Sequence, residues 1–88
     1  MVVGGRCTRN PAVLWRSTSR GPVVLAPDRV APERLSGTAA VIWELLDQPL
    51  DPEELGDGVA LVVGRPADVA TSLDLLVEAR LVASRPDG

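Results

Sequence analysis

Along the chain, the apolar positions follow first an extended and then a helical pattern. Two short apolar runs, at residues 12–16 and 23–26, and an interrupted stretch at residues 29–35 are separated by clusters of Ser, Gly, Pro and Asp. Short runs bounded by turn-forming residues are typical of strands joined by tight turns. We therefore predict an antiparallel meander of three strands over these residues.

Beyond the strands, apolar residues recur at helical spacing and predict three short helices. The first covers residues 38–47 and is ended by Pro49. The second begins with Asp-Pro-Glu-Glu at residues 51–54 and ends at Gly64. In this motif Asp can cap the free amides, Pro fits the first turn, and the second Glu can bond back to the cap. The third starts at Pro66, and its apolar stripe is Val69, Leu73, Leu76 and Val77.

Three strands followed by three helices make an α+β domain. Short helices with an attached antiparallel sheet describe a winged helix-turn-helix-like arrangement, with Trp43 of the first helix in the core. The 88 residues leave room for one domain, which we place at residues 11–83. Residues 1–10 have little periodicity and are expected to be a flexible N-terminus in which Cys7 is a spare apolar residue, and residues 84–88 a frayed C-terminus.

The composition argues against an enzyme. The chain has no histidine and a single cysteine, so the usual zinc sites and histidine-based catalytic groups lack the residues to build them. We expect no metal site and no cofactor. No apolar run approaches the roughly 20 residues that span a bilayer, and the N-terminus lacks the features of a signal peptide. These observations predict a cytoplasmic protein with no membrane partner.

The charge is divided unevenly along the chain. Up to Ser36, six Arg stand against two acidic residues, whereas from Gly37 onward three Arg stand against ten. The two halves therefore carry opposite charge, and each can attract a different partner. Acidic helices disfavour DNA binding, because a recognition helix needs Arg, Lys, Asn or Gln to meet phosphates and bases. We expect no nucleic-acid partner.

Three segments carry a family resemblance. Residues 35–47 read Leu-Ser-Gly-Thr-Ala-Ala-Val-Ile-Trp-Glu-Leu-Leu-Asp, residues 50–55 read Leu-Asp-Pro-Glu-Glu-Leu, and residues 76–82 read Leu-Val-Glu-Ala-Arg-Leu-Val. In this order and spacing, the chain resembles the PqqD-like family of recognition elements for ribosomally made precursor peptides. It departs from the family at Arg80, where a Gly is usual, and at Pro32, which lies in the strand that family members use for binding.

The resemblance implies a non-catalytic protein that binds the leader region of a precursor peptide. The leader is added as an extra strand beside the third strand, packs against the third helix, and is delivered to a modifying enzyme such as a protease, radical enzyme or ligase. The residues expected to bind the peptide are Arg29, Val30, Ala31, Glu33, Arg34, Leu35, Ser72, Leu75, Leu76, Ala79 and Arg80. Among them, the three Arg are expected to pair with acidic leader residues.

Two arrangements of the binding edge are possible, and they differ in the direction that Pro32, which has no N–H to donate, faces. If it faces the second strand, Ala31, Glu33 and Leu35 pair with the added strand; we favour this arrangement because the ladder is then complete. If it faces outward, Val30 and Arg34 must pair, with a gap between them. Alternatively, Pro32 only blunts an edge against aggregation.

A different function is also open: a structural adaptor that docks a maturation enzyme on its acidic helical half without holding a leader.

Overall fold

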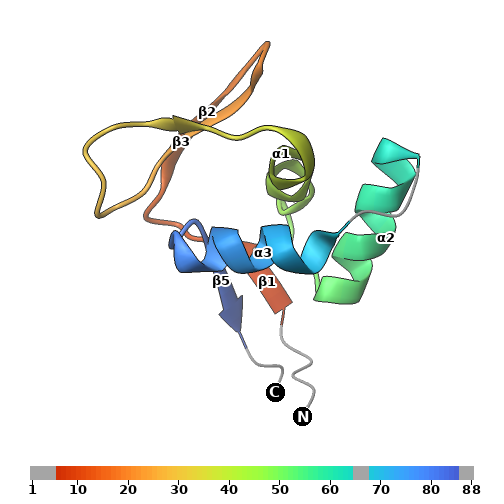
Figure 1. Cartoon of the computed structure of the whole chain (residues 1–88). Helices are drawn as coiled ribbons and strands as arrows, with labels where there is room; N and C mark the ends of the chain where they lie inside the picture. Colours follow the sequence, from red (N-terminus) through yellow and green to blue (C-terminus); the bar gives the residue numbers. More distant parts are fainter. Residues whose placement is uncertain (1–5, 65–67, 86–88) are drawn as a thin grey trace.

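The computed structural model describes residues 6–64 and 68–85. Over these residues the chain forms β1 (Arg6–Arg9), β2 (Leu14–Thr18), β3 (Gly21–Leu25), β4 (Glu33–Arg34), α1 (Gly37–Leu45), α2 (Pro52–Val63), α3 (Val69–Glu78) and β5 (Val82–Arg85). Strands β2, β3 and β4 make an antiparallel sheet in that order (Figure 1). The predicted α+β class, with a three-stranded antiparallel sheet followed by three helices, is therefore confirmed.

A second, two-stranded sheet joins the two ends of the described chain. Strand β1 pairs antiparallel with β5 beneath α3 (Figure 1). On its other side, Cys7 exchanges two backbone hydrogen bonds with Leu50, of 2.7 and 3.1 Å, and it is buried. The expected flexible N-terminus is thus wrong for residues 6–9, as is the frayed C-terminus for residues 84–85. Residues 1–5 and 86–88 lie outside the described residues.

Arg9, on β1, ties this second sheet to α1. Its Nε and Nη2 donate hydrogen bonds of 2.9 and 2.7 Å to the carbonyl of Trp43. The guanidinium lies 4.4 Å from the ring centre of Trp15 and 5.2 Å from that of Trp43, within cation–π range. Trp43 is fully buried, as predicted, whereas Trp15 remains 39% exposed. One arginine therefore bridges the two sheets and the first helix.

The predicted start of α2 is confirmed in detail. Asp51 accepts a hydrogen bond from the Glu54 N–H (2.8 Å), and the Glu54 carboxylate accepts one from the Asp51 N–H (2.9 Å). Gly64 ends the helix in the left-handed conformation, with φ 84°. The expected start of α3 at Pro66 falls outside the described residues; its first described turn is capped by Asp68, which accepts from the Thr71 N–H.

Helix α3 ends in a Schellman motif whose left-handed residue is Arg80. The N–H of Leu81 bonds to the carbonyl of Leu76, and the N–H of Arg80 to that of Val77, both at 3.0 Å. Arg80 has φ 63°, and no other non-glycine residue of the described chain has positive φ. Glycine is usual at this position because it has no Cβ. The left-handed exit from α3 is thus made with an arginine.

The third strand is much shorter than predicted. Strand β4 contains only Glu33–Arg34, whereas residues 27–32 form a loop that begins with a hydrogen bond from the Arg29 N–H to the Ala26 carbonyl (3.1 Å). Prolines at both ends of this loop cannot donate to a ladder, which accounts for the loss of pairing. The expected strand at residues 29–35 is therefore wrong over most of its length.

Candidate functional site

A groove between β4 and α3 collects most of the predicted site residues. It has a volume of about 200 Å³. It is lined by Glu33, Leu35, Ala39, Ser72, Leu75, Leu76, Ala79 and Leu81. The α3 residues share one helix face because they stand at positions i, i+3, i+4 and i+7. Six residues expected from the sequence, from two distant segments, thus lie around one cavity.

The groove has a closed apolar floor and an open apolar wall. Leu35, Leu76 and Leu81 are at most 6% exposed and form part of the core, whereas Leu75 is 62% exposed. A large apolar side chain held open beside a cavity can be covered by an apolar group of a ligand. Leu75 is therefore an open apolar side chain of the groove that a ligand could cover.

Two lining residues were missed by the sequence reasoning. Leu81 follows Arg80 in the Schellman motif, where the residue after the left-handed position regularly packs against the last turn of the helix, here at Leu76. That motif was the available signal for Leu81. Ala39 lies on the first turn of α1, and nothing in its sequence context distinguishes it from the other small residues there.

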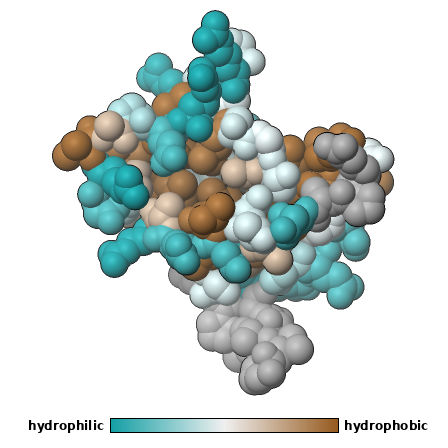
Figure 2. Space-filling view, in the orientation of Figure 1, coloured by the Kyte–Doolittle hydropathy of each residue, from teal (hydrophilic) through white to brown (hydrophobic). Residues whose placement is uncertain are grey.

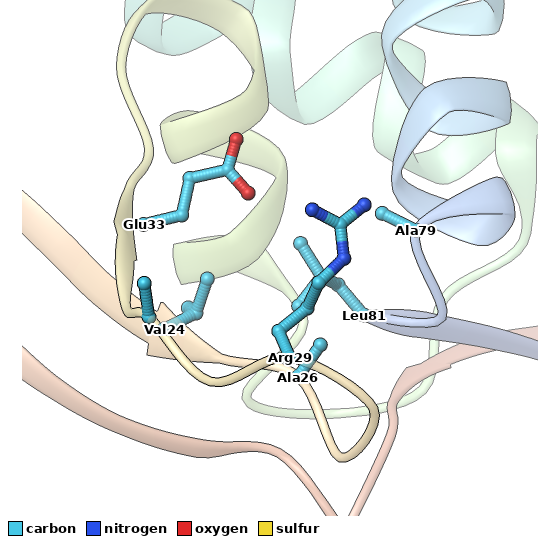
Figure 3. Close-up of a pocket in the computed structure, with 7 residues that line it drawn as sticks. Val24, Ala26, Arg29, Glu33, Ala79 and Leu81 are labelled. Carbon is cyan, nitrogen blue, oxygen red and sulfur yellow. The ribbon is translucent and has the colours of Figure 1, made fainter.

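A smaller hollow of about 10 Å³ adjoins the groove at Glu33 and Ala79. Arg29 and Ala31, both expected at the site, line it together with Val24, Ala26 and Leu81. Figure 3 shows the charged ends of Glu33 and Arg29 directed toward the space between them, from the two sides of the hollow. Glu33 and Arg29 form no ion pair with each other or with any other described residue. Both charges therefore remain available to a ligand.

The residues of β4 that direct their backbone groups outward are not those we favoured. The Leu35 N–H donates a 2.9 Å hydrogen bond to the Pro22 carbonyl, so Leu35 faces β3. Along an antiparallel ladder the pairing alternates, which turns Glu33 toward β3 and the backbone of Arg34 outward. The arrangement in which Ala31, Glu33 and Leu35 pair with an added strand is therefore wrong. Within β4, the outward edge offers the N–H and C=O of Arg34, and Pro32 before it has no N–H to donate.

Glycine makes this register possible. Gly21 starts β3 with φ 111°, and a Cβ built on it would lie 2.9 Å from the carbonyl oxygen of Leu35. A side chain at residue 21 would push the end of β4 away from β3. The close approach of the two strands thus fixes which residues of β4 face outward.

Three expected site residues lie outside the lining of the groove and the hollow. Val30 is fully exposed in the loop before β4. Arg34 pairs with Val23 and lies on the sheet face away from the helices, whereas the neighbouring pair contains the buried Val24. Arg80 is exposed beyond the end of α3. Of the three arginines expected to meet acidic leader residues, Arg29 lines the hollow and none lines the groove.

A second apolar surface lies on α1 and α2. Leu61 and Val62 are 85% and 63% exposed, and Figure 2 shows apolar atoms gathered toward this end of α2. Val62 borders a cavity of about 240 Å³ that also involves Glu44 and Leu45 of α1. This surface belongs to the acidic half of the chain, where the adaptor alternative places its docking face.

The described residues contain neither a candidate metal cluster nor a membrane-spanning helix. Within residues 6–64 and 68–85, no group of three or more acidic, Cys or His side chains is placed to hold a metal ion. In the same part of the chain, no helix is long and apolar enough to cross a membrane.

Burial raises the pKa of the Cys7 thiol, and a hydrogen bond with Ser84 opposes this effect by lowering it. This thiol lies away from the groove.

Comparison with known proteins finds no relative of this chain. No protein-family model matches the chain, and neither a search of curated proteins nor one of solved structures finds a match.

Proposed function

We propose that this protein binds the leader region of a ribosomally made precursor peptide and delivers it to a modifying enzyme. The observation that carries the proposal is the groove in which the edge of β4 meets the exposed Leu75 of α3. A leader added as a strand beside β4 directs alternate side chains into this groove. The resemblance to the PqqD-like family and its winged-helix arrangement supports the same reading of the site.

One apolar side chain can supply about as much of the affinity as the backbone. Within β4, the edge offers an added strand two main-chain hydrogen-bonding groups, both on Arg34. Each hydrogen bond contributes about 0.5–1.5 kcal/mol net. Burying one leucine-sized side chain contributes about 1.5–3 kcal/mol. A peptide that places such a side chain against Leu75 therefore gains as much there as from most of the ladder.

The chain itself performs no chemistry in this proposal. Holding the leader raises the effective concentration of the attached core peptide at the active site of a partner enzyme, which is a protease, radical enzyme or ligase. The protein works in the cytoplasm, where precursor peptides are made, without metal or cofactor. Neither a membrane nor a nucleic acid takes part.

An NMR titration tests the proposal. The ¹⁵N-labelled chain is titrated with the leader of a precursor peptide encoded beside it. We expect amide shifts confined to residues 33–36 and to the groove side of α3, with saturation at micromolar peptide. Leu75→Asp should abolish the shifts, whereas Leu61→Asp, a matched change at an exposed leucine of α2, should leave them. Shifts confined to α1 and α2, or binding that only Leu61→Asp removes, would contradict leader binding at this groove.

The apolar surface of α1 and α2 favours one second candidate, the structural adaptor. Leu61 and Val62 are exposed, and Val62 borders a cavity that α1 and α2 line together with the start of β3. Such an apolar surface on the acidic helices suits a partner protein with basic residues around an apolar centre. Gel filtration with a candidate enzyme, with and without leader, separates the two functions. An adaptor forms the complex without peptide and loses it in Leu61→Asp, whereas a leader carrier that docks elsewhere is unaffected by that change.

A further inference from the structure

The free edge of β4 places an arginine opposite one defined residue of any added strand. The backbone of Arg34 points away from β3, and its side chain lies on the sheet face away from the helices, because Arg34 pairs with Val23 and the core-facing Val24 pairs with Glu33. Directly opposed residues of neighbouring strands have their side chains on the same face. The residue opposite Arg34 therefore shares its face whether the added strand is parallel or antiparallel.

That face of the sheet is positively charged. Arg16, Val23 and Arg34 stand in one row across β2, β3 and β4. Among the described residues, neither guanidinium of this row has a hydrogen bond or an ion pair with another residue. The strand residues that share this face are Leu14, Arg16, Thr18, Val23, Leu25 and Arg34. No carboxylate is among them, so an acidic residue opposite Arg34 is favoured and a basic one is opposed by like charge.

In the added strand, the two residues next to the one opposite Arg34 direct their side chains to the other face of the sheet, toward the helices. The neighbour that lies over Leu35 faces the groove of about 200 Å³ beside Leu75. An apolar cavity of about 150 Å³ is large enough to hold benzene. The groove therefore has room for one side chain of the size of leucine or phenylalanine.

We propose that the peptide this protein selects is an extended segment in which an acidic residue directly adjoins a bulky apolar residue. The acid lies opposite Arg34 on the outer face, and the apolar side chain enters the groove against Leu75. The inference rests on the proposed strand addition and narrows its ligand to a sequence pattern. The pattern follows from the register of β4, which assigns the two adjacent peptide side chains to opposite faces of the sheet.

Selection from a random library tests the pattern without knowledge of the natural leader. The full chain is immobilised and used to select displayed random 12-residue peptides; enriched peptides are synthesised and their affinities measured by fluorescence polarisation. We expect enrichment of Asp or Glu next to Leu, Ile or Phe. Changing that acid to Lys should weaken binding by more than the roughly 1.4- to fivefold of a single cross-strand ion pair, because it also places like charges opposite each other.

Two variants of the protein assign the preference to a residue. Arg34→Glu should invert it, so that the Lys peptide binds more tightly than the acidic one. Arg16→Glu is the matched control, because Arg16 lies on the same face but across β3 from the free edge; it should leave the preference for acid. Both residues are exposed, and circular dichroism verifies that the variants fold.

The possible failures are distinguishable. If no peptide is enriched, or if NMR places the selected peptides away from β4 and α3, strand addition at this edge fails and the pattern fails with it. If peptides bind the groove but show no preference for an adjacent acid, the pattern alone is overturned and leader binding stands. An acid preference that survives Arg34→Glu, or that Arg16→Glu removes equally, also overturns the assignment to Arg34.

Discussion

Replacing Arg80 by glycine should stabilise the protein. Arg80 holds φ 63° at the end of α3, where the Schellman hydrogen bonds fix its backbone. Its carbonyl also accepts a 2.8 Å hydrogen bond from Asn10 Nδ2, whereas its exposed guanidinium has no hydrogen bond or ion pair with the described residues. The change therefore removes a strained Cβ and leaves every backbone contact in place.

Two opposing effects set the magnitude. The left-handed conformation costs a residue with a Cβ about 1–2 kcal/mol, and glycine avoids this cost. Glycine also gives the unfolded chain more freedom, which takes back about 0.4–1 kcal/mol. The net gain expected for Arg80→Gly is about 0.5–1 kcal/mol. In a domain of this size it corresponds to a rise in Tm of about 2–8 °C.

Thermal and urea unfolding followed by circular dichroism measure the gain. Arg80→Ala is the control, because it removes the same guanidinium and keeps the Cβ; it should be no more stable than the original chain. Equal stabilities for Arg80→Gly and Arg80→Ala would refute the assignment of strain to this backbone. Since Arg80 lies outside the groove lining, Arg80→Gly should also leave peptide affinity unchanged.

Three further outcomes are expected. Arg9→Met removes both hydrogen bonds to the Trp43 carbonyl and should lower the free energy of unfolding by about 1–3 kcal/mol in urea; a change within about 0.5 kcal/mol would mean that this contact is not stabilising. Hydrogen bonds from Thr71 lower the pKa of Asp68, so its contribution to stability is present above about pH 4 and is lost as pH falls through the lowered pKa. Asp68→Asn should flatten the stability curve over this acidic range, and an unchanged curve would contradict the capping role. Because Cys7 is 2% exposed, a thiol reagent near pH 8 should modify the native chain far more slowly than the urea-unfolded chain; equal rates would contradict its burial.

The parts of the fold that the sequence predicts are those set by neighbours along the chain. The capping box at Asp51 and Glu54 involves residues three apart, and the pattern alone identifies it. The pairing of β1 with β5 joins residues at opposite ends of the sequence, and neither segment has a strand pattern strong enough to reveal its partner. The sequence therefore places Cys7 in a loose terminus, although in the structure it lies between β5 and Leu50, with which it exchanges two backbone hydrogen bonds.

The same distinction between local and long-range contacts applies to the candidate site. Helical spacing on α3 was enough to predict that Ser72, Leu75 and Ala79 share a face, and the structure brings them to Leu35. The face of β4 was not predictable, because a shift of one residue exchanges every side chain between the two faces. The hydrogen bond from Leu35 to Pro22 decides it, and this contact depends on the close approach at Gly21.

The proposed peptide binding is compatible with edge protection at β4 because this strand is so short. An edge strand with a full ladder invites pairing with any extended chain, including another copy of the protein. Here one residue, Arg34, offers both hydrogen-bonding groups, and Pro32 offers no donor beside it, so the backbone alone holds a passing strand weakly. In the proposed function, a peptide gains enough free energy to stay bound only if its side chains also fit the groove at Leu75. Under that proposal, the missing donor of Pro32 would both blunt the edge against indiscriminate pairing and leave selection to the side chains of the ligand.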